Sequence, residues 1–316
     1  MEQNEIEQKL GEIKKLAARM GVDAGAELEK LEAKIKAGSD AGKVWRHVEL
    51  ARHPMRPYAM DYIVRVFNGW TELRGDRYFG DDPAIIGGLA FAGKRPVTVI
   101  AHQKGRTLKE NLFRNHGMAN PEGYRKALRL ARQAEKFRRP VITFVDTAGA
   151  YPGLGSEERG IGEAIARNLF ELSRLQTPVI CFIIGEGGSG GALGLCVGDK
   201  VYMLENAIYS VISPEGGASI LLRDSARAKD AAAMLRLTSA DLLRFKLING
   251  VINEPEGGAH MDIDGVARQI KAVIDRELDE LCARPIQAIV RYRNKKISKM
   301  GQWQDAPLNT GAKDAL

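Results

Sequence analysis

One stretch of this sequence predicts both the fold and the kind of site: Val179-Ile180-Cys181-Phe182-Ile183-Ile184-Gly185-Glu186-Gly187-Gly188-Ser189-Gly190-Gly191-Ala192-Leu193. The apolar run is typical of a buried strand, and the glycines after it predict a turn into a helix that opens at Gly190. The N-terminus of a helix exposes backbone N–H groups that lack a partner within the helix. Because glycine has no Cβ atom, a ligand can approach these amides closely. We therefore expect an anion or oxyanion site built from backbone.

The composition is typical of a soluble globular protein, since 44% of the 316 residues are hydrophobic and 28% are charged. No apolar run approaches the roughly 20 residues that span a bilayer, and the charged segment 1–15 lacks the apolar core of a signal peptide. We therefore expect a cytoplasmic protein with no membrane association. The cysteines, Cys181, Cys196 and Cys282, form no CxxC pair, so neither a disulfide framework nor a zinc ribbon is predicted.

The formal net charge of +7 favours attraction to anionic partners, which makes a basic RNA-binding module one alternative function. The basic residues are spread along the expected helices, with one modest cluster at 291–299. A solvent-exposed helix face explains this cluster as well as contact with phosphate does. Charge alone does not predict nucleic-acid binding, and nucleic acid is not expected as a partner.

The chain is expected to divide into three parts. Residues 1–40 carry a narrow apolar stripe between charged residues, with a break at 21–25, which predicts a helical hairpin that packs on the main domain or on another subunit. The main domain is expected to cover residues 41–301. The polar tail, 302–316, is expected to be disordered.

The main domain is predicted to be a mostly parallel sheet with helices packed outside. Pro54 and Pro57 favour an irregular connector over residues 47–54. Two short apolar runs, at 84–91 and 97–102, predict a β-hairpin, and strand–turn–helix units follow it. Further segments are a long basic loop at 103–120, strands at 141–145, 179–184, 201–204, 208–212 and 247–252, and helices that begin near Asn120, Ser156, Gly190, Ser213, Asp224, Asp264 and Pro285.

Two motifs overlap the glycine stretch and give alternative functions. Gly185-x-Gly187-x-x-Gly190, with Glu205 about 20 residues further on, satisfies the fingerprint of a dinucleotide site. A Rossmann unit begins its sheet with that strand, however, whereas here a hairpin and further elements precede it. Gly187-x-Ser189-x-Gly191 satisfies the GxSxG motif of a serine hydrolase or thioesterase, and His260 is the one histidine that follows it. A serine in a glycine-rich turn also matches this motif by chance.

A second turn that contains glycine and proline, at residues 146–153, follows another strand of the same predicted sheet. Two neighbouring strand ends can each donate an amide N–H to one developing oxygen anion. This third interpretation is an oxyanion hole with no side-chain nucleophile, which suits a thioester enolate or a ureido oxygen.

Five motifs carry a resemblance to a known family. In chain order they are His102-Gln103-Lys104-Gly105-Arg106, Asn120-Pro121-Glu122-Gly123-Tyr124-Arg125-Lys126-Ala127-Leu128, Asp146-Thr147-Ala148-Gly149-Ala150-Tyr151-Pro152-Gly153, Gly185-Glu186-Gly187-Gly188-Ser189-Gly190-Gly191-Ala192-Leu193 and Tyr209-Ser210-Val211-Ile212-Ser213-Pro214-Glu215-Gly216. The chain resembles the carboxyltransferase alpha subunit of bacterial acetyl-CoA carboxylase from about residue 10 to residue 301. This resemblance implies an α/β fold, a crotonase-like ββα spiral preceded by the N-terminal helical hairpin.

The resemblance implies transfer of a carboxyl group from carboxybiotin, held on a biotin carboxyl carrier protein, to acetyl-CoA. The product would be malonyl-CoA, in the first committed step of fatty acid synthesis. The resemblance further implies a beta subunit of the same fold that brings a zinc ribbon, an alpha2beta2 assembly, and biotin carboxylase as a partner. No metal is expected in this chain, and a carboxyltransferase for another acyl-CoA is an alternative.

The resemblance assigns the oxyanion hole to backbone amides of Gly149, Ala150, Gly190, Gly191 and Ala192, with the biotin ureido oxygen as the anion. Biotin N1, and not a protein carboxylate, would take the methyl proton of acetyl-CoA. The other expected substrate-binding residues are Lys104, Arg106, Tyr151, Pro152, Gly153, Gly187, Gly188, Ser189, Pro214, Glu215 and Gly216.

Four ionisable side chains lie at or shortly after the ends of the expected strands. Lys104 and Arg106 either contact CoA phosphates or the partner subunit, or are solvated loop charges. Glu186 is expected to accept amide hydrogen bonds and to hold the glycine turn. His102, at the end of a strand, is expected to be a structural histidine.

Overall fold

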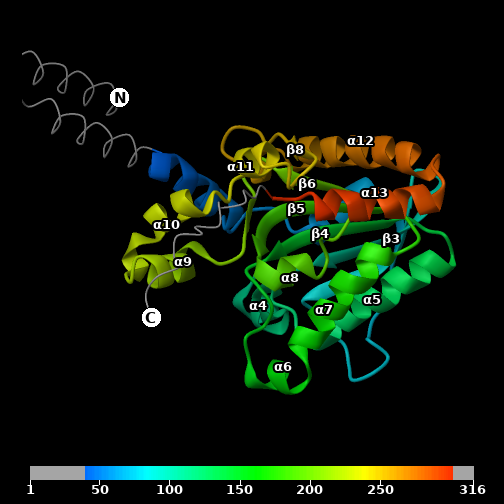
Figure 1. Ribbon diagram of the computed structural model, residues 1–316, viewed down its shortest axis with the longest axis horizontal. Coiled ribbons are helices and arrows are strands. Elements are labelled where there is room, and N and C mark those ends of the chain that lie inside the picture. The colour runs from blue at the N-terminus through cyan, green and yellow to red at the C-terminus, as the bar shows by residue number, and fades with distance from the viewer. Residues whose placement is uncertain (1–39, 302–316) are drawn as a thin grey trace, which may run out of the picture.

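An eight-stranded sheet forms the centre of the computed structural model, which describes residues 40–301 (Figure 1). The helical hairpin expected over 1–40 and the tail expected over 302–316 therefore lie outside the described residues, apart from residue 40. The strands are β1 (Asn68–Glu72), β2 (Ile85–Ala92), β3 (Arg95–His102), β4 (Val141–Thr147), β5 (Val179–Gly188), β6 (Lys200–Leu204), β7 (Ile208–Ser210) and β8 (Gly250–Ile252).

Helices follow or flank most of these strands. They are α3 (Ala59–Val66), α4 (Leu108–Phe113), α5 (Pro121–Lys136), α6 (Leu154–Glu158), α7 (Ile161–Arg174), α8 (Ser189–Leu193), α9 (Pro214–Leu221), α10 (Ala228–Leu235), α11 (Ser239–Arg244), α12 (Ile263–Cys282) and α13 (Ile286–Ser298), with short 3-10 turns at Asn115–Gly117, Ser225–Arg227 and Ala259–Met261. No helix within residues 40–301 is both long and apolar enough to cross a membrane.

The sheet begins antiparallel and continues parallel. Its strand order is β1-β2-β3-β4-β5-β6-β8, and β7 pairs with the end of β5. The predicted hairpin is confirmed, because β2 and β3 pair antiparallel from Ile85↔His102 to Ala92↔Arg95. Every later pairing, from β3 with β4 to β6 with β8, is parallel, which confirms the predicted type of sheet. The carboxyl ends of the central strands therefore meet at one edge of the sheet.

Helices cover both faces of this sheet (Figure 1). On the face under α3, the rings of Phe144, Phe182 and Tyr202 stack from strand to strand at centroid distances of 5.5 and 5.8 Å, and Tyr62 of α3 packs on Phe144. On the other face α5 lies so close to β2 that a Cβ atom at Gly87 would be 2.3 Å from a methyl carbon of Leu130. Both faces of the central strands are consequently buried.

A buried ion pair fixes α13 to the sheet. The fully buried guanidinium of Arg293 bonds both oxygens of Asp199, at 2.9 and 2.7 Å, and also donates to the carbonyls of Leu172, Leu175 and Thr177. All of its contacts lie on segments that are distant in sequence, so that α7, β5 and α13 share one anchor.

A small lobe lies beside the sheet and has its own core. Residues 40–51 are helical, and Val48 and Ala51 pack with Ala232 of α10 and with Leu237. Figure 1 shows this helix next to α9 and α10, on the left of the view. The irregular connector expected over 47–54 is therefore wrong for its first part, because the helix ends before Pro54 and the proline does not interrupt it.

Two other expectations need correction. The long loop expected over 103–120 contains α4, which begins with a capping box formed by Thr107 and Glu110. The single helix expected from Ser156 is two helices, α6 and α7, because Gly160 between them has a φ of 79°. The helix expected after Asn120 is confirmed as α5.

Replacing Arg293 by methionine should lower the free energy of unfolding by about 3–5 kcal/mol, because it leaves Asp199 buried without its partner. Urea titration would measure the loss. Arg167→Met removes an exposed ion pair with Glu163 on α7 and should change stability by no more than about 0.5 kcal/mol. Equal midpoints for the two variants would contradict the anchoring role of Arg293.

Candidate active site at the ends of β4 and β5

The two glycine-containing turns pack directly on each other. A Cβ atom at Gly191 would lie 2.4 Å from the carbonyl carbon of Gly149 and 2.6 Å from the nitrogen of Ala150. A Cβ atom at Gly188 would lie 2.0 Å from the carbonyl oxygen of Ala148. Backbone therefore contacts backbone with no room for a side chain, and the predicted meeting of the two strand ends is confirmed.

The first glycines of the stretch, up to Gly188, belong to strand β5, and the turn comes after them. Gly187 pairs with Thr147 of β4, while Glu186, Gly187 and Gly188 pair with β7. The chain turns only at Ser189, which has a φ of 49° and begins α8. The expected helix start at Gly190 is thus one residue late. Because α8 has five residues, its dipole is small.

The free amides can be identified one by one. The N–H of Gly149 donates to Thr147 Oγ1 at 3.2 Å, whereas no hydrogen bond within residues 40–301 uses the N–H of Ala150. The N–H groups of Gly190 and Gly191 lie in the first turn of α8, where the helix offers no acceptor. The hydroxyl of Tyr124, on α5, donates to the carbonyl of Gly191 at 3.3 Å. This bond helps to hold the peptide group between Gly191 and Ala192 in place. Ala150, Gly190 and Gly191 are the amides best placed to bind an anion.

A series of linked ion pairs lies next to the two turns. The ammonium of Lys104 lies 2.7 Å from Asp146 Oδ1 and 3.1 Å from Glu186 Oε2. Arg52 continues the chain, with Nε 2.8 Å from Glu186 Oε1 and a terminal nitrogen 2.6 Å from Glu215 Oε1. We call these five side chains the charge chain. They come from five separate parts of the sequence and converge at the ends of β3, β4 and β5.

Glu186 differs from its expected role. Its side chain pairs with two cations, and it is Asp146 Oδ1 that accepts a backbone N–H, that of Glu186, at 3.0 Å. The prediction that Glu186 holds the turn by accepting amide bonds is therefore wrong, and Asp146 has that role. Sequence reasoning also missed Arg52, because nothing local to it points to a strand so distant in sequence.

The paired charges shift the ionisation of this chain. Burial raises the pKa of Glu186, but Lys104 and Arg52 lower it more, so that its pKa lies below the usual value. Burial lowers the pKa of Lys104, but Asp146 and Glu186 raise it more, so that the ammonium keeps its proton. The hydrogen bond from Arg52 lowers the pKa of Glu215. Lys104, Glu186 and Glu215 are therefore charged near neutral pH.

The two cations expected to be ligands both have partners within the chain. Lys104 belongs to the charge chain, and its side chain is only 13% exposed. Arg106 lies 2.5 Å from Asp61 Oδ2, and its guanidinium stacks over Tyr58 at 4.6 Å from the ring centroid. Their contact with CoA phosphates or with a partner stays a prediction. His102 is fully buried, and burial lowers its pKa to about 3. The expectation of a structural histidine with satisfied hydrogen bonds is wrong, because neither of its ring nitrogens has a partner within residues 40–301.

The remaining expected residues lie around the same turns. Tyr151 is 37% exposed and its N–H donates to the carbonyl of Ala119, while Pro152 is exposed beside it. Gly153 is the N-cap of α6, and a Cβ atom there would be 2.4 Å from the ring of Tyr151. Pro214, Glu215 and Gly216 form the first turn of α9, where Ser213 accepts the N–H of Gly216 at 3.1 Å. Their role as ligands stays a prediction.

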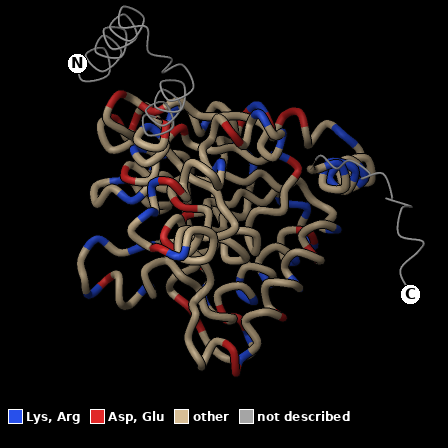
Figure 2. Tube along the Cα trace, turned by 60° about the vertical axis from the view of Figure 1, so that its left-hand side comes forward, with Lys and Arg blue, Asp and Glu red and all other residues tan. Residues whose placement is uncertain are grey.

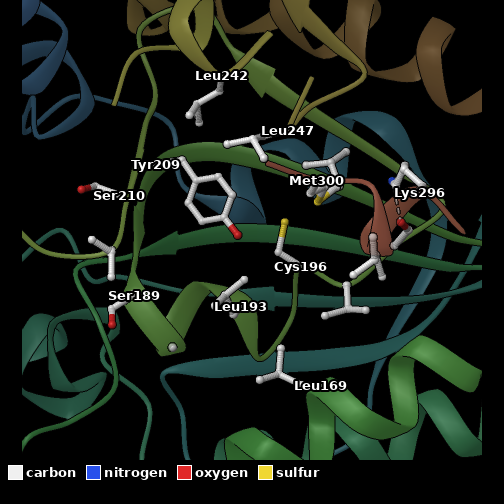
Figure 3. Close-up of a pocket in the computed structure, with 16 residues that line it drawn as sticks. Leu169, Ser189, Leu193, Cys196, Tyr209, Ser210, Leu242, Leu247, Lys296 and Met300 are labelled. Atoms are coloured by element: carbon white, nitrogen blue, oxygen red, sulfur yellow. Dashed lines mark hydrogen bonds between the residues drawn. The ribbon is translucent and has the colours of Figure 1, made fainter. Parts of the chain in front are cut away.

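An apolar cavity of about 420 Å³ opens beside α8 (Figure 3). Figure 3 shows the hydroxyl of Tyr209 pointing toward Cys196, with Leu193 below them in the view. It is lined by Leu169, Ser189, Gly190, Leu193, Cys196, Val197, Gly198, Val201, Tyr209, Ser210, Val211, Leu242, Leu247, Lys296, Ile297 and Met300. Because Gly190 is part of this lining, a ligand that reaches the free amides can place an apolar group here.

The hydrolase motif and the dinucleotide fingerprint both lack the neighbouring residues that their functions would require. No hydrogen bond within residues 40–301 joins Ser189 to a histidine, and the ring of His260 stacks on His53 at 4.0 Å. Glu205, the acidic residue of the dinucleotide fingerprint, accepts the N–H of Glu254 at 2.9 Å. Four strands of the same sheet, β1 to β4, also precede β5 in the chain, whereas the fingerprint strand of a Rossmann unit comes first. These contacts disfavour both the hydrolase and the dinucleotide site.

Charges of both signs are interspersed over most of the trace, with a basic cluster where the described chain ends (Figure 2). Such mixing does not favour a nucleic-acid surface. Within residues 40–301, no three His, Cys, Asp or Glu side chains lie together as a metal site would require.

Comparison with known proteins gives one consistent family. The family model described as acetyl co-enzyme A carboxylase carboxyltransferase-like matches residues 1–301. A relative from Treponema denticola, named acetyl-coenzyme A carboxylase carboxyl transferase subunit alpha, is 62% identical over 296 residues, or 94% of this chain and 97% of that protein. A relative of the same name from Geobacillus kaustophilus is 51% identical over 302 residues, or 94% of this chain and 93% of that protein.

A solved structure supports the fold. Transcarboxylase 12S, with methylmalonyl-coenzyme A and methylmalonic acid bound, has a TM-score of 0.58 at 20% identity. The match covers 71% of this chain and 41% of that one. At this identity the likeness concerns the fold alone, and it confirms the crotonase-like α/β fold that the resemblance implied.

Glu186→Gln should make the fold less stable at pH 7, and this deficit should shrink on acidification. The folded-state pKa of Glu186 lies below its unfolded value, so its contribution is present above about pH 4.5 and is lost as the pH falls through the folded pKa. Urea midpoints at pH 7 and at about pH 3.5 would measure the change. The exposed control Glu163→Gln should leave both midpoints nearly unchanged. A deficit that grew on acidification would contradict the assignment.

Proposed function

Because the chain belongs to the family of acetyl-CoA carboxylase carboxyltransferase alpha subunits, we propose that it transfers the carboxyl group of carboxybiotin to acetyl-CoA. The product of this reaction is malonyl-CoA. The observation that carries the proposal is the close packing of the turns at Gly149–Ala150 and Gly190–Gly191, in a chain 62% identical to a carboxyltransferase alpha subunit. A carboxyltransferase for another acyl-CoA would use the same site.

The proposed role of the free amides is to stabilise an oxyanion. Carboxybiotin, carried on a separate protein, would supply the carboxyl group, and biotin N1 would supply the base. The N–H groups of Ala150, Gly190 and Gly191 would donate to the oxygen on which negative charge develops. Removing one such donor typically costs about 2.7–4 kcal/mol of transition-state stabilisation. We propose the biotin ureido oxygen as this anion, with the thioester enolate held by the beta subunit.

Gly149 and Ala192, the other two members of the expected hole, have a supporting role in this proposal. Gly149 gives its N–H to Thr147 and its carbonyl accepts the Thr147 hydroxyl at 2.6 Å, which holds the turn. Ala192 is fully buried and lies inside α8. The cavity beside α8 would take an apolar part of a substrate.

A beta subunit is proposed as the obligatory partner, in an alpha2beta2 assembly that biotin carboxyl carrier protein and biotin carboxylase complete. Exposed large apolar side chains on the elements next to the turns support a partner surface. Figure 1 shows α4, α6, α8 and α9 toward one end of the sheet. The exposed residues there are Leu108, Leu112, Phe113, Tyr151, Leu154, Leu193, Val211, Ile220 and Leu221. The expected cytoplasmic location stays a prediction.

The chain should be inactive alone and should form malonyl-CoA once a beta subunit and a carboxylated biotin carrier are added. Formation of labelled malonyl-CoA, measured with and without the partner, tests this. Ser189→Ala should keep most of the activity, since no nucleophile is needed. Partner-independent hydrolysis of thioesters that Ser189→Ala abolishes would overturn the proposal in favour of the hydrolase.

Gly191→Val should lower kcat by at least about 100-fold, because its side chain would displace the backbone of Gly149 and Ala150 from the hole. The variant should still unfold cooperatively, since the change is confined to the turns. Gly162→Ala is the matched control: a Cβ atom at Gly162 of α7 meets nothing within 4 Å, so activity should be unchanged. Full activity in a folded Gly191→Val protein would rule out the oxyanion role.

A further inference from the structure

We propose that Lys104 is a positioning residue: its ammonium joins Asp146 of β4 to Glu186 of β5, and so sets both the spacing and the charge beneath the two amide turns. The inference rests on the proposed oxyanion role of those turns. It gives Lys104 a task that differs from the phosphate contact expected from its position in the sequence.

The first argument is geometric. Lys104 follows the last residue of β3, Asp146 lies near the carboxyl end of β4, and Glu186 lies near the carboxyl end of β5. One ammonium therefore links the carboxyl ends of three adjacent strands. Asp146 also accepts the N–H of Glu186 at 3.0 Å, and its Oδ1 would be 2.4 Å from a Cβ atom at Gly185. The carboxylate of Asp146 is therefore held against the backbone of β5.

The second argument concerns the register of β4 and β5. Their pairing is regular as far as Val145↔Ile183 and then shifts before Thr147↔Gly187, so Asp146 lies at the irregularity. Ladder hydrogen bonds alone do not fix the spacing of the strands there. The bonds of Asp146 to Lys104 and to the N–H of Glu186 replace them, immediately before Gly149 and Gly188 come into contact.

The third argument is electrostatic. The charge chain holds three carboxylates, Asp146, Glu186 and Glu215, against the cations Lys104 and Arg52, which leaves one net negative charge. Removing Lys104 would leave two, next to amides that must stabilise a further anion. Asp146 and Glu186 would then lack the cation between them and would repel each other.

Lys104 is buried by elements on every side. A Cβ atom at Gly117 would be 2.8 Å from Lys104 Cγ, so the stem is enclosed as well as the ammonium. Outside the charge chain, Tyr58 and His102 lie close enough to Lys104 to be affected by its charge, and Asp61 and Arg106 lie next to Tyr58. Burial raises the pKa of Tyr58 and lowers that of His102, so both are neutral near pH 7 and neither could replace the missing cation.

Lys104→Met in the complex with the beta subunit should lower kcat by about 100-fold, while the KM for acetyl-CoA changes by less than about threefold. Its kcat should rise relative to the wild type as the pH falls from about 8 to 6, because a proton shared by the two carboxylates restores the lost positive charge. A merely structural residue would lower stability without this pH dependence.

Two further variants control the test. Lys200 of β6 lies between Glu277 and Glu280, at 2.9 and 3.4 Å, and its side chain is 17% exposed, which matches Lys104 closely. It lies at the opposite end of the strands, so Lys200→Met should leave kcat within about twofold. The double variant Lys104→Met/Asp146→Asn removes the repulsion between Asp146 and Glu186. Its kcat should be at least about tenfold higher than that of Lys104→Met alone.

Amide hydrogen exchange provides a readout that does not need activity. In Lys104→Met the N–H of Glu186 should exchange at least about tenfold faster, since its acceptor is no longer held in place. An inactive wild-type complex would overturn the proposed function, while exchange would still test the inference. Unchanged exchange, or a Lys104→Met enzyme with wild-type kcat and pH profile, would overturn the inference.

Discussion

The contact of glycine backbone with glycine backbone between the ends of β4 and β5 is the constraint on which the rest of the structure depends. With 2.0–2.4 Å between a hypothetical Cβ atom at Gly188 or Gly191 and the neighbouring backbone, no side chain fits. The two strand ends must therefore be held at a fixed depth relative to each other. The parallel sheet sets that depth, Tyr124 holds the Gly191 carbonyl from α5, and the charge chain holds the strand ends from the other side.

An active site made of amides places unusual demands on its surroundings. A side-chain nucleophile can find its geometry by rotating, whereas a backbone N–H can move only with its peptide. The precision must come from elements that position the peptides, which explains why buried polar side chains gather behind turns that themselves carry few functional groups. Under the proposed function the reacting groups would arrive on other molecules, and this chain would contribute the positions of the amides and the electrostatic field around them.

The sequence predicted the elements that have strong local patterns. The hairpin, the parallel strands and α5 followed from apolar periodicity and turn residues, and the pairing of two glycine turns led to the site. The errors have physical causes. Gly185–Gly188 were read as a turn, but β7 pairs with them and keeps them extended. Arg52 was invisible because its partners lie 134 and 163 residues away, and ion pairs at such separations leave no local signal.

The small lobe has a consequence for how the site responds to its surroundings. Its core, around Val48 and Ala232, is separate from the main core, and segments with little buried apolar surface open at lower free energy than the rest of a fold. Arg52 follows the helix of this lobe and holds Glu186 and Glu215. If this lobe opened, Arg52 would separate from Glu186 and Glu215, and a positive charge would move away from the amides of the two turns. A molecule that packs on the lobe would then change the electrostatic potential at the turns without touching them.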